Sequence, residues 1–315
     1  MKVVSVINFK GGVGKTTLSL HLASFLAKTH NVLLIDIDHQ SSLSIVLLGA
    51  SKWEELVATG MTINSVFESY SNRKVAMPGN EIIVNFPSQF RKAMWPRYDT
   101  LDFVCAQFEL DDTEIDLAST NYGNVSQSEW EKRTLLPEWL DQISADERYD
   151  YVIIDCPPAT KIVSQNAIAS SHGVIVPVIP DEMSSRGVTH FASLIKTKVD
   201  DKLAFLKEAA RIRDEDVPSS YVETTSLAAI VPSIIKTAGN AASGMTNIHT
   251  QQLAALKRQW GASVLEKMSK NYIGVPEATN AGKPVWDYWG QNSKPKVKRM
   301  MRGVCQALQE RIDRL

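Results

Sequence analysis

Two lysines and two threonines are set among glycines in the stretch 8–17, which runs NFKGGVGKTT. Glycines let the backbone approach a ligand closely and point N–H groups at it, and such groups bind phosphate oxygens. Lys15 is placed to reach the β- and γ-phosphates of a nucleotide, and the Thr16 hydroxyl to hold Mg²⁺. The stretch predicts a phosphate-binding loop, with candidate contacts at Lys10, Gly11, Gly12, Val13, Gly14, Lys15, Thr16 and Thr17.

Three aspartates follow apolar runs and are candidates to act on the same ligand. Asp36 and Asp38 end the run NVLLIDID, and Asp155 ends the run YDYVIID. Ligands bind at the carboxyl ends of the strands in parallel α/β sheets. We expect Asp38 to position and polarise the attacking water, and Asp36 and Asp155 to orient Mg²⁺ through its coordinated waters. Thr16 would be the direct protein ligand of the metal.

The elements that must position these side chains surround the motifs. An apolar run at 3–7 predicts a strand before the loop, and 18–27 predicts a buried helix after it. Continuous apolar runs are typical of strands covered on both faces, as in parallel sheets. We also expect strands at 101–106, 173–180 and 228–235, a possible strand at 81–86, and helices at 130–143, 183–199 and 251–260. The predicted fold class is α/β: a P-loop NTPase fold with a twisted, mostly parallel sheet and helices on both faces.

Composition restricts the class of protein. The chain has 315 residues, of which 44% are hydrophobic and 22% charged, as in ordinary soluble domains. Its formal net charge of −1 means that any nucleic-acid binding must come from a local patch. The three scattered cysteines lack metal-ligand spacing and favour a reducing cytoplasm. The chain opens directly on a strand and holds no apolar run of the ~20 residues that a membrane span needs. We therefore expect a cytoplasmic protein without stable membrane insertion.

The loop departs from the ordinary phosphate-binding pattern at one place. That pattern has glycine six residues before its lysine, whereas this chain has Phe9 there, followed by a second lysine, Lys10. The variant KGGVGKT, with DIDHQ at 36–40 and YDYVIIDCPP at 149–158, resembles the ParA/MinD family of P-loop ATPases with a deviant Walker A loop. The segment 269–288, which contains EATNAGKPV, fits the same family more loosely.

The resemblance implies an ATP hydrolase that converts ATP and water to ADP and phosphate, slowly and under stimulation by a partner. Lys10, Lys15 and Asp38 would be its catalytic residues. In this family the signature lysine, here Lys10, crosses a dimer interface to the phosphates of the partner's nucleotide, so two chains would sandwich two ATP molecules. The turn around Val275 and Pro276 would line the adenine. The whole of 1–315 would form a single domain, with a possible insertion at about 71–98.

The end of the chain has two interpretations. No acidic residue occurs between Tyr288 and Gln309, and apolar residues recur at helical spacing, which predicts a basic helix at about 294–313 packed on the core. Its charged side is either a solvated surface or a surface that grips phosphates. The resemblance to ParA favours non-specific DNA binding through Lys294, Lys296, Lys298, Arg299 and Arg302.

The family contains several functions, and the residues leave them open. We favour a nucleoid-associated ATPase that partitions a plasmid or chromosome, or positions another cargo, together with a ParB-type activator. The alternatives are a MinD-like membrane-associated positioning ATPase and a nucleotide-dependent adaptor with negligible turnover. The acidic run at 109–116 similarly fits either a solvated helix start or a docking face for a basic partner.

Overall fold

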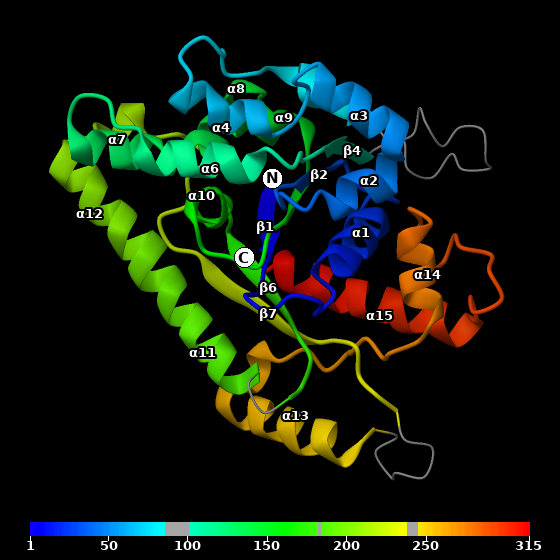
Figure 1. The fold of residues 1–315 in the computed structure, drawn as a ribbon. Helices are drawn as coiled ribbons and strands as arrows, with labels where there is room; N and C mark the ends of the chain where they lie inside the picture. The colour runs from blue at the N-terminus through cyan, green and yellow to red at the C-terminus, as the bar shows by residue number, and fades with distance from the viewer. Residues whose placement is uncertain (86–100, 182–183, 238–244) are drawn as a thin grey trace.

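A seven-stranded sheet forms the centre of the part of the chain that the computed structural model describes, which is residues 1–85, 101–181, 184–237 and 245–315 (Figure 1). The strand order is β3-β4-β2-β5-β1-β6-β7, and every neighbouring pair is parallel except β3 with β4. The strands are β1 (Lys2–Val6), β2 (Val32–Asp36), β3 (Val84–Asn85), β4 (Leu101–Val104), β5 (Tyr151–Asp155), β6 (Gly173–Val178) and β7 (Ser226–Pro232). This confirms the predicted mostly parallel α/β sheet.

Helices cover both faces of the sheet, which is why all residues of β2 and β5 are buried. One face packs against α4 (Asn64–Ser71), α6 (Leu110–Ser119), α8 (Leu135–Gln142), α10 (Ile162–Ala169) and α11 (Ser184–Leu194). The opposite face packs against α1 (Lys15–Leu26), α2 (Ser42–Leu48), α3 (Ala50–Ala58), α14 (Gly274–Asn280) and α15 (Pro295–Ile312). Figure 1 shows these two groups on either side of the strands.

The remaining described helices add to the layer that contains α4 and α8, and several short turns connect the elements. They are α7 (Val125–Glu131), α9 (Ala145–Arg148), α12 (Asp201–Ala210), α13 (Asn247–Trp260), a π-helical turn (Ile195–Asp200) and short 3-10 turns at Asn80–Ile82, Asp214–Asp216 and Gly261–Ser263. The predicted helix at 183–199 therefore corresponds to α11 and the π-helical turn. Part of the predicted insertion, residues 86–98, lies outside the described residues.

Two local predictions were wrong. The single helix expected at 130–143 is two helices, α7 and α8, because Pro137 lacks the N–H that would bond the carbonyl of Arg133. The buried Lys132 also ties the break to the preceding loop, where its Nζ donates to the Thr120 carbonyl at 2.9 Å. The proline turn expected at Val275 and Pro276 is the first turn of α14. Proline is tolerated there because first-turn N–H groups have no partner within the helix.

Candidate nucleotide-binding site

The glycine-rich stretch forms a loop between β1 and α1. Gly12 and Gly14 have φ angles of 70° and 90°, a region that glycine enters without strain. Two hydrogen bonds hold the loop in place: the Ser233 hydroxyl, just after β7, donates to the Val13 carbonyl at 2.7 Å, and Asn8 Nδ2 donates to the Pro177 carbonyl of β6 at 2.7 Å. The loop is thus shaped before a ligand arrives, with the N-terminus of α1 directly behind it.

Lys15 and Thr16 begin helix α1, where the prediction needs them. Lys15 is buried, and its Nζ lies 3.5 Å from the carbonyl oxygen of Lys10 across the loop. Thr16 Oγ1 donates to Asp155 Oδ2 at 2.8 Å, and Ser19 Oγ donates to Asp155 Oδ1 at 2.8 Å. The hydroxyl expected to bind Mg²⁺ and the carboxylate expected to orient it are therefore in direct contact.

The sheet register brings two of the three aspartates together. Asp36 of β2 pairs in register with Asp155 of β5, next to Val6 at the end of β1. Asp36 is fully buried and accepts hydrogen bonds from the Ser44 N–H at 3.0 Å, the Ser44 hydroxyl at 2.7 Å and the Asp38 N–H at 3.0 Å. These donors fix the carboxylate and help to compensate its burial.

Burial shifts the ionisation of both carboxyl groups. Loss of solvation raises the pKa of Asp155 to about 7. Loss of solvation and the nearby Asp155 raise the pKa of Asp36 well above its usual value. A divalent cation would relieve both effects, and a hydroxyl with carboxylates is a hard-oxygen donor set that suits Mg²⁺. Among the described residues no group of three or more His, Cys, Asp or Glu side chains could hold a metal ion by itself.

Asp38 lies at the mouth of the site. Its Oδ1 accepts the Gln40 N–H at 3.0 Å, which turns the chain sharply after β2. Its Oδ2 has no hydrogen bond to any described residue, so this oxygen is free to accept a proton from a water. The Asp38 side chain is 14% exposed, whereas Asp36 and Asp155 are buried.

A cavity of about 120 Å³ adjoins the loop on the side away from the aspartates. Gly14 and Thr17 form its loop side, and its other walls include Ile234, Tyr272, Pro276 and Met301. Ile234 has a φ of 52°, which is strained for a β-branched residue and points to a functional constraint. Pro276 lines this cavity, where an adenine base would lie; its contact with adenine stays a prediction.

Lys10 is placed differently from Lys15. Its Nζ forms an ion pair with Asp181 of the same chain, and its side chain is 48% exposed. The Asn8 Oδ1 accepts the Lys10 N–H at 3.0 Å, which fixes the backbone of this residue but leaves the long side chain movable. Contact of Lys10 with a partner's nucleotide stays a prediction.

Sequence reasoning missed several supporting residues. Ser19 and Ser44 hold the two buried aspartates, and Ser233 and Ile234 hold the loop and the cavity. A signal for Ser19 was present, because residues three apart share a helix face and Thr16 was already identified. Ser44, Ser233 and Ile234 carried no such signal, since they reach the site only through the folded sheet.

The five predicted DNA-binding residues gather around the start of α15, as the helix buries its apolar side through Val297 and Met301. Two grooves of about 600 and 570 Å³ flank the helix, and Arg299 lines both. Lys267 and Lys270 add charge to the first groove. Lys296 lies 4.9 Å from the Tyr272 ring centre, and Lys298 lies 4.4 Å from that of Trp289, which is 75% exposed. We call Lys267, Lys270, Trp289 and the five predicted residues the basic face.

Comparisons with known proteins give the family and the fold of the chain. A family model described as an AAA domain matches residues 1–207. The putative replication protein A of Sinorhizobium fredii is 30% identical over 200 residues, which span 62% of this chain and 44% of that protein. The chromosome partitioning protein ParA of Caulobacter vibrioides is 29% identical over 197 residues, which span 62% of each chain. The matched region thus covers less than two thirds of either relative's length.

The similarity to a solved structure extends further along the chain. McdA of Cyanothece has a TM-score of 0.66 at 18% identity, and the match covers 98% of this chain and 99% of that chain. Another structure of McdA, with a TM-score of 0.65, is an ATP complex. The family model covers the phosphate loop and all three aspartates, and the structural similarity covers the same mostly parallel sheet with its helices. The chain therefore belongs to the AAA-domain family and, within it, to the ParA group.

Proposed function

We propose that the chain hydrolyses ATP to ADP and phosphate and uses this reaction to partition DNA or to position another cargo. The loop N–H groups and Lys15 would hold the β- and γ-phosphates, with the base in the cavity beside Tyr272. Mg²⁺ bound to Thr16 would neutralise charge that develops between these phosphates. The free Oδ2 of Asp38 would accept a proton from the attacking water.

Dimerisation would complete the site. Two chains would face each other across their phosphate loops, and Lys10 would leave Asp181 to contact the γ-phosphate bound by the partner. An exposed lysine held by one ion pair can make this exchange at little cost, because exposed ion pairs contribute only ~0–1 kcal/mol. The ATP-dependent homodimer is supported by the position of Lys10 and by membership of the ParA group.

The observation that carries DNA binding is the double role of helix α15. Met301 lines the cavity for the base, while Arg299 and Arg302 are exposed on the outer side of the same helix. Nucleotide and DNA would therefore contact opposite sides of one rigid element. Lysines and arginines with an exposed tryptophan suit phosphate contacts and base or sugar packing without sequence preference. A ParB-type protein would then stimulate hydrolysis and release.

A MinD-like function is the second candidate, because Trp289 beside Lys298 and Arg302 would also suit a membrane interface. Two observations weigh against it. The apolar side of α15 is packed into the core and is not available to enter lipid. None of the helices formed by described residues combines the length and apolarity needed to cross a bilayer.

DNA binding measured against salt tests the proposal. Each duplex phosphate contact contributes about 0.9 to the slope of log affinity against log salt. Arg299→Ala with Arg302→Ala should therefore lower the slope on unrelated sequences by about 1.8 for each chain that contacts DNA, or about 3.6 for the ATP-bound dimer. Lys196→Ala with Lys198→Ala, an equal charge change on the exposed π-helical turn, is the matched control. ATP binding should survive in both double variants.

Two results would contradict the proposed DNA surface. An unchanged slope in the Arg299 and Arg302 variant would move the DNA contact to another surface. Wild-type binding to vesicles of anionic lipid but not to duplex DNA would replace the DNA function with the membrane function. Both measurements need ATP, ADP and nucleotide-free arms, because only ATP should promote the dimer that doubles the phosphate contacts.

A further inference from the structure

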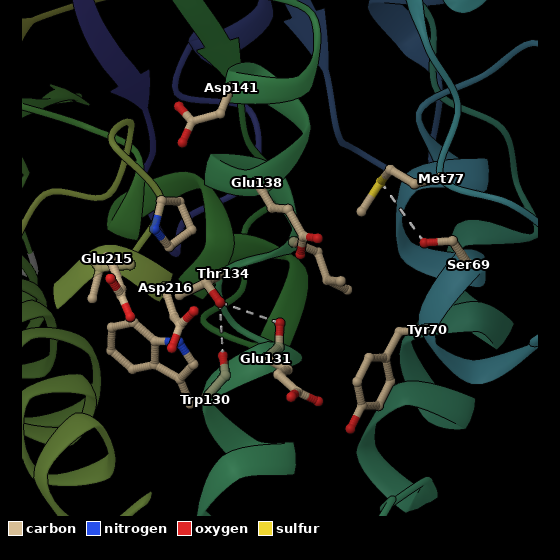
Figure 2. Close-up of a pocket in the computed structure, with 13 residues that line it drawn as sticks. Ser69, Tyr70, Met77, Trp130, Glu131, Thr134, Glu138, Asp141, Glu215 and Asp216 are labelled. Atoms are coloured by element: carbon tan, nitrogen blue, oxygen red, sulfur yellow. Dashed lines mark hydrogen bonds between the residues drawn. The ribbon is translucent and has the colours of Figure 1, made fainter. Parts of the chain in front are cut away.

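A second large cavity lies on the opposite side of the sheet from the basic face. It is a groove of about 600 Å³ between α4, the α7–α8 segment and the loop after α12. Figure 2 shows Tyr70 and Met77 on one side and Trp130, Glu215 and Asp216 on the other. Val217 and Pro218, which follow Asp216 in the chain, also line the groove. Figure 2 shows Glu131 and Glu138 projecting from the α7–α8 segment between these two sides, with the remaining carboxylates at Asp141, Glu215 and Asp216. We call this feature the acidic groove.

The negative charge of the acidic groove is not neutralised by any residue that lines it. Five carboxylates line it, and no lysine, arginine or histidine is among its lining residues. Three of the carboxylates already have structural roles. Asp141 accepts the Ser219 hydroxyl at 2.8 Å and so holds the rim, and Arg213 outside the groove pairs with both Glu215 and Asp216. The two that remain, Glu131 and Glu138, form no ion pair with any described residue.

Glu138 shows the imbalance most clearly. Glu131 at least accepts the Gln127 amide at 2.8 Å, whereas no described residue donates a hydrogen bond to the Glu138 carboxylate. Partial burial, Glu131 and Asp141 raise the pKa of Glu138 above its usual value. A cation placed between Glu131 and Glu138 would remove this repulsion, and the partly exposed ring of Tyr70 also lines the groove.

We propose that the acidic groove binds an extended segment of a partner protein that carries arginine or lysine beside apolar residues. The basic groups would pair with Glu131 and Glu138, and the apolar residues would cover Met77, Val217 and Pro218. Arginine fits best, because its planar group pairs with carboxylates and stacks on aromatic rings. The combination of carboxylates with apolar walls favours a peptide over a small polyamine, which would leave the apolar walls uncovered.

The position of the acidic groove would let a partner protein and DNA bind at the same time. The groove packs on the α4 and α8 side of the sheet, and the basic face lies on the α1 and α15 side (Figure 1). A partner in the groove and DNA on the basic face would not compete for space. This assignment rests on the chemistry of the groove and not on DNA binding, so either can fail while the other stands.

A labelled peptide tests the proposal on the full chain. The probe is an acetylated, amidated peptide of alternating arginine and leucine, and its control has citrulline, which is neutral and of similar shape, at each arginine. We expect the arginine peptide to bind, and Glu131→Gln with Glu138→Gln to weaken binding at least about tenfold. Glu54→Gln with Glu147→Gln, an equal charge change at exposed positions, should alter it less than about twofold. Thermal melting should show all variants folded, and basal ATP hydrolysis should not change.

Several outcomes would overturn the proposal. Equal losses in the two double variants would mean that only overall charge attracts the peptide. Equal binding of the citrulline peptide would remove the role of the cation, and displacement by spermine at matching affinity would make the groove a polyamine site. Sedimentation at low salt would reveal a second copy of the chain as the occupant, if self-association occurred and the Glu131 and Glu138 variant abolished it.

Discussion

The carboxylates of the nucleotide site and those of the acidic groove differ in how the fold holds them. Asp36 and Asp155 are fully enclosed, and hydroxyl and backbone donors at 2.7–3.0 Å occupy their oxygens. Glu138 is more accessible and has no donor among the described residues. A carboxylate that is fixed by short contacts is suited to orient a metal or a water. One that lacks a partner is suited to bind a cation from outside. The predictions below test the nucleotide-site side of this comparison, and the peptide experiment tests the groove.

Replacing Asp38 should have the largest effect. We expect Asp38→Ala to slow ATP hydrolysis by about 10²–10⁴-fold, the usual contribution of a positioned acid or base, while ATP binding and dimerisation persist.

Lys10→Ala should instead lose ATP-dependent dimerisation and keep part of the nucleotide affinity. Phosphate release and sedimentation with ATP measure the two effects, and equal monomer fractions for both variants would disprove the division of roles.

The pH dependence of stability comes next in size. The pKa of Asp155 is about 7 in the fold against 3.8 in the unfolded chain, so the folded protein retains this proton to higher pH. The contribution of Asp155 to stability is therefore greatest below about pH 4 and falls as pH rises to about 7, by up to about 4 kcal/mol. Urea unfolding without nucleotide or Mg²⁺ should show a flatter profile for Asp155→Asn than for the wild type. Exposed Asp112→Asn should leave the profile unchanged, and equal profiles for the wild type and Asp155→Asn would contradict the shift.

Replacing Lys15 should cost less free energy, and the loss can be measured on ATP binding separately from turnover. Lys15→Ala removes a charge-assisted contact worth about 1.5–3 kcal/mol, so ATP affinity should fall by about 10–100-fold. Calorimetry or a fluorescent ATP analogue measures the loss of affinity. Lys28→Ala, which removes a lysine just after α1 and outside the loop, is the control. Unchanged ATP affinity in Lys15→Ala would mean that the loop does not bind the phosphates.

The two sites also differ in how far the sequence predicts them. The phosphate loop and Asp36, Asp38 and Asp155 could be found because short contiguous motifs place each one at the end of an apolar strand. The sheet and its covering helices followed from the same runs. Ser44 and Ile234 could not be found, since the first meets Asp36 only through the packing of α2, and the strained φ of the second is a property of the folded turn.

The acidic groove lay beyond sequence reasoning for a related reason. Its carboxylates come from the α7–α8 segment and from the loop after α12, and the break between α7 and α8 that shapes this segment was missed. In the acidic run at 109–116, two of the five acids have contacts within the fold, and a docking role for the run stays a prediction. Glu114 accepts the Val163 N–H at the start of α10, and Asp111 pairs with Lys161. Crowding of acids in sequence was thus a poorer guide than their convergence in space.

The shared wall formed by α15 has a thermodynamic consequence. If ATP contact at Met301 and DNA contact at Arg302 favour the same placement of this helix, each ligand must raise the affinity of the other by the same factor. DNA would then slow the loss of ATP as well as ATP promoting DNA binding. A surface rich in DNA would accordingly retain the ATP-bound protein. The nucleotide state of the protein would then determine where along that surface it stays.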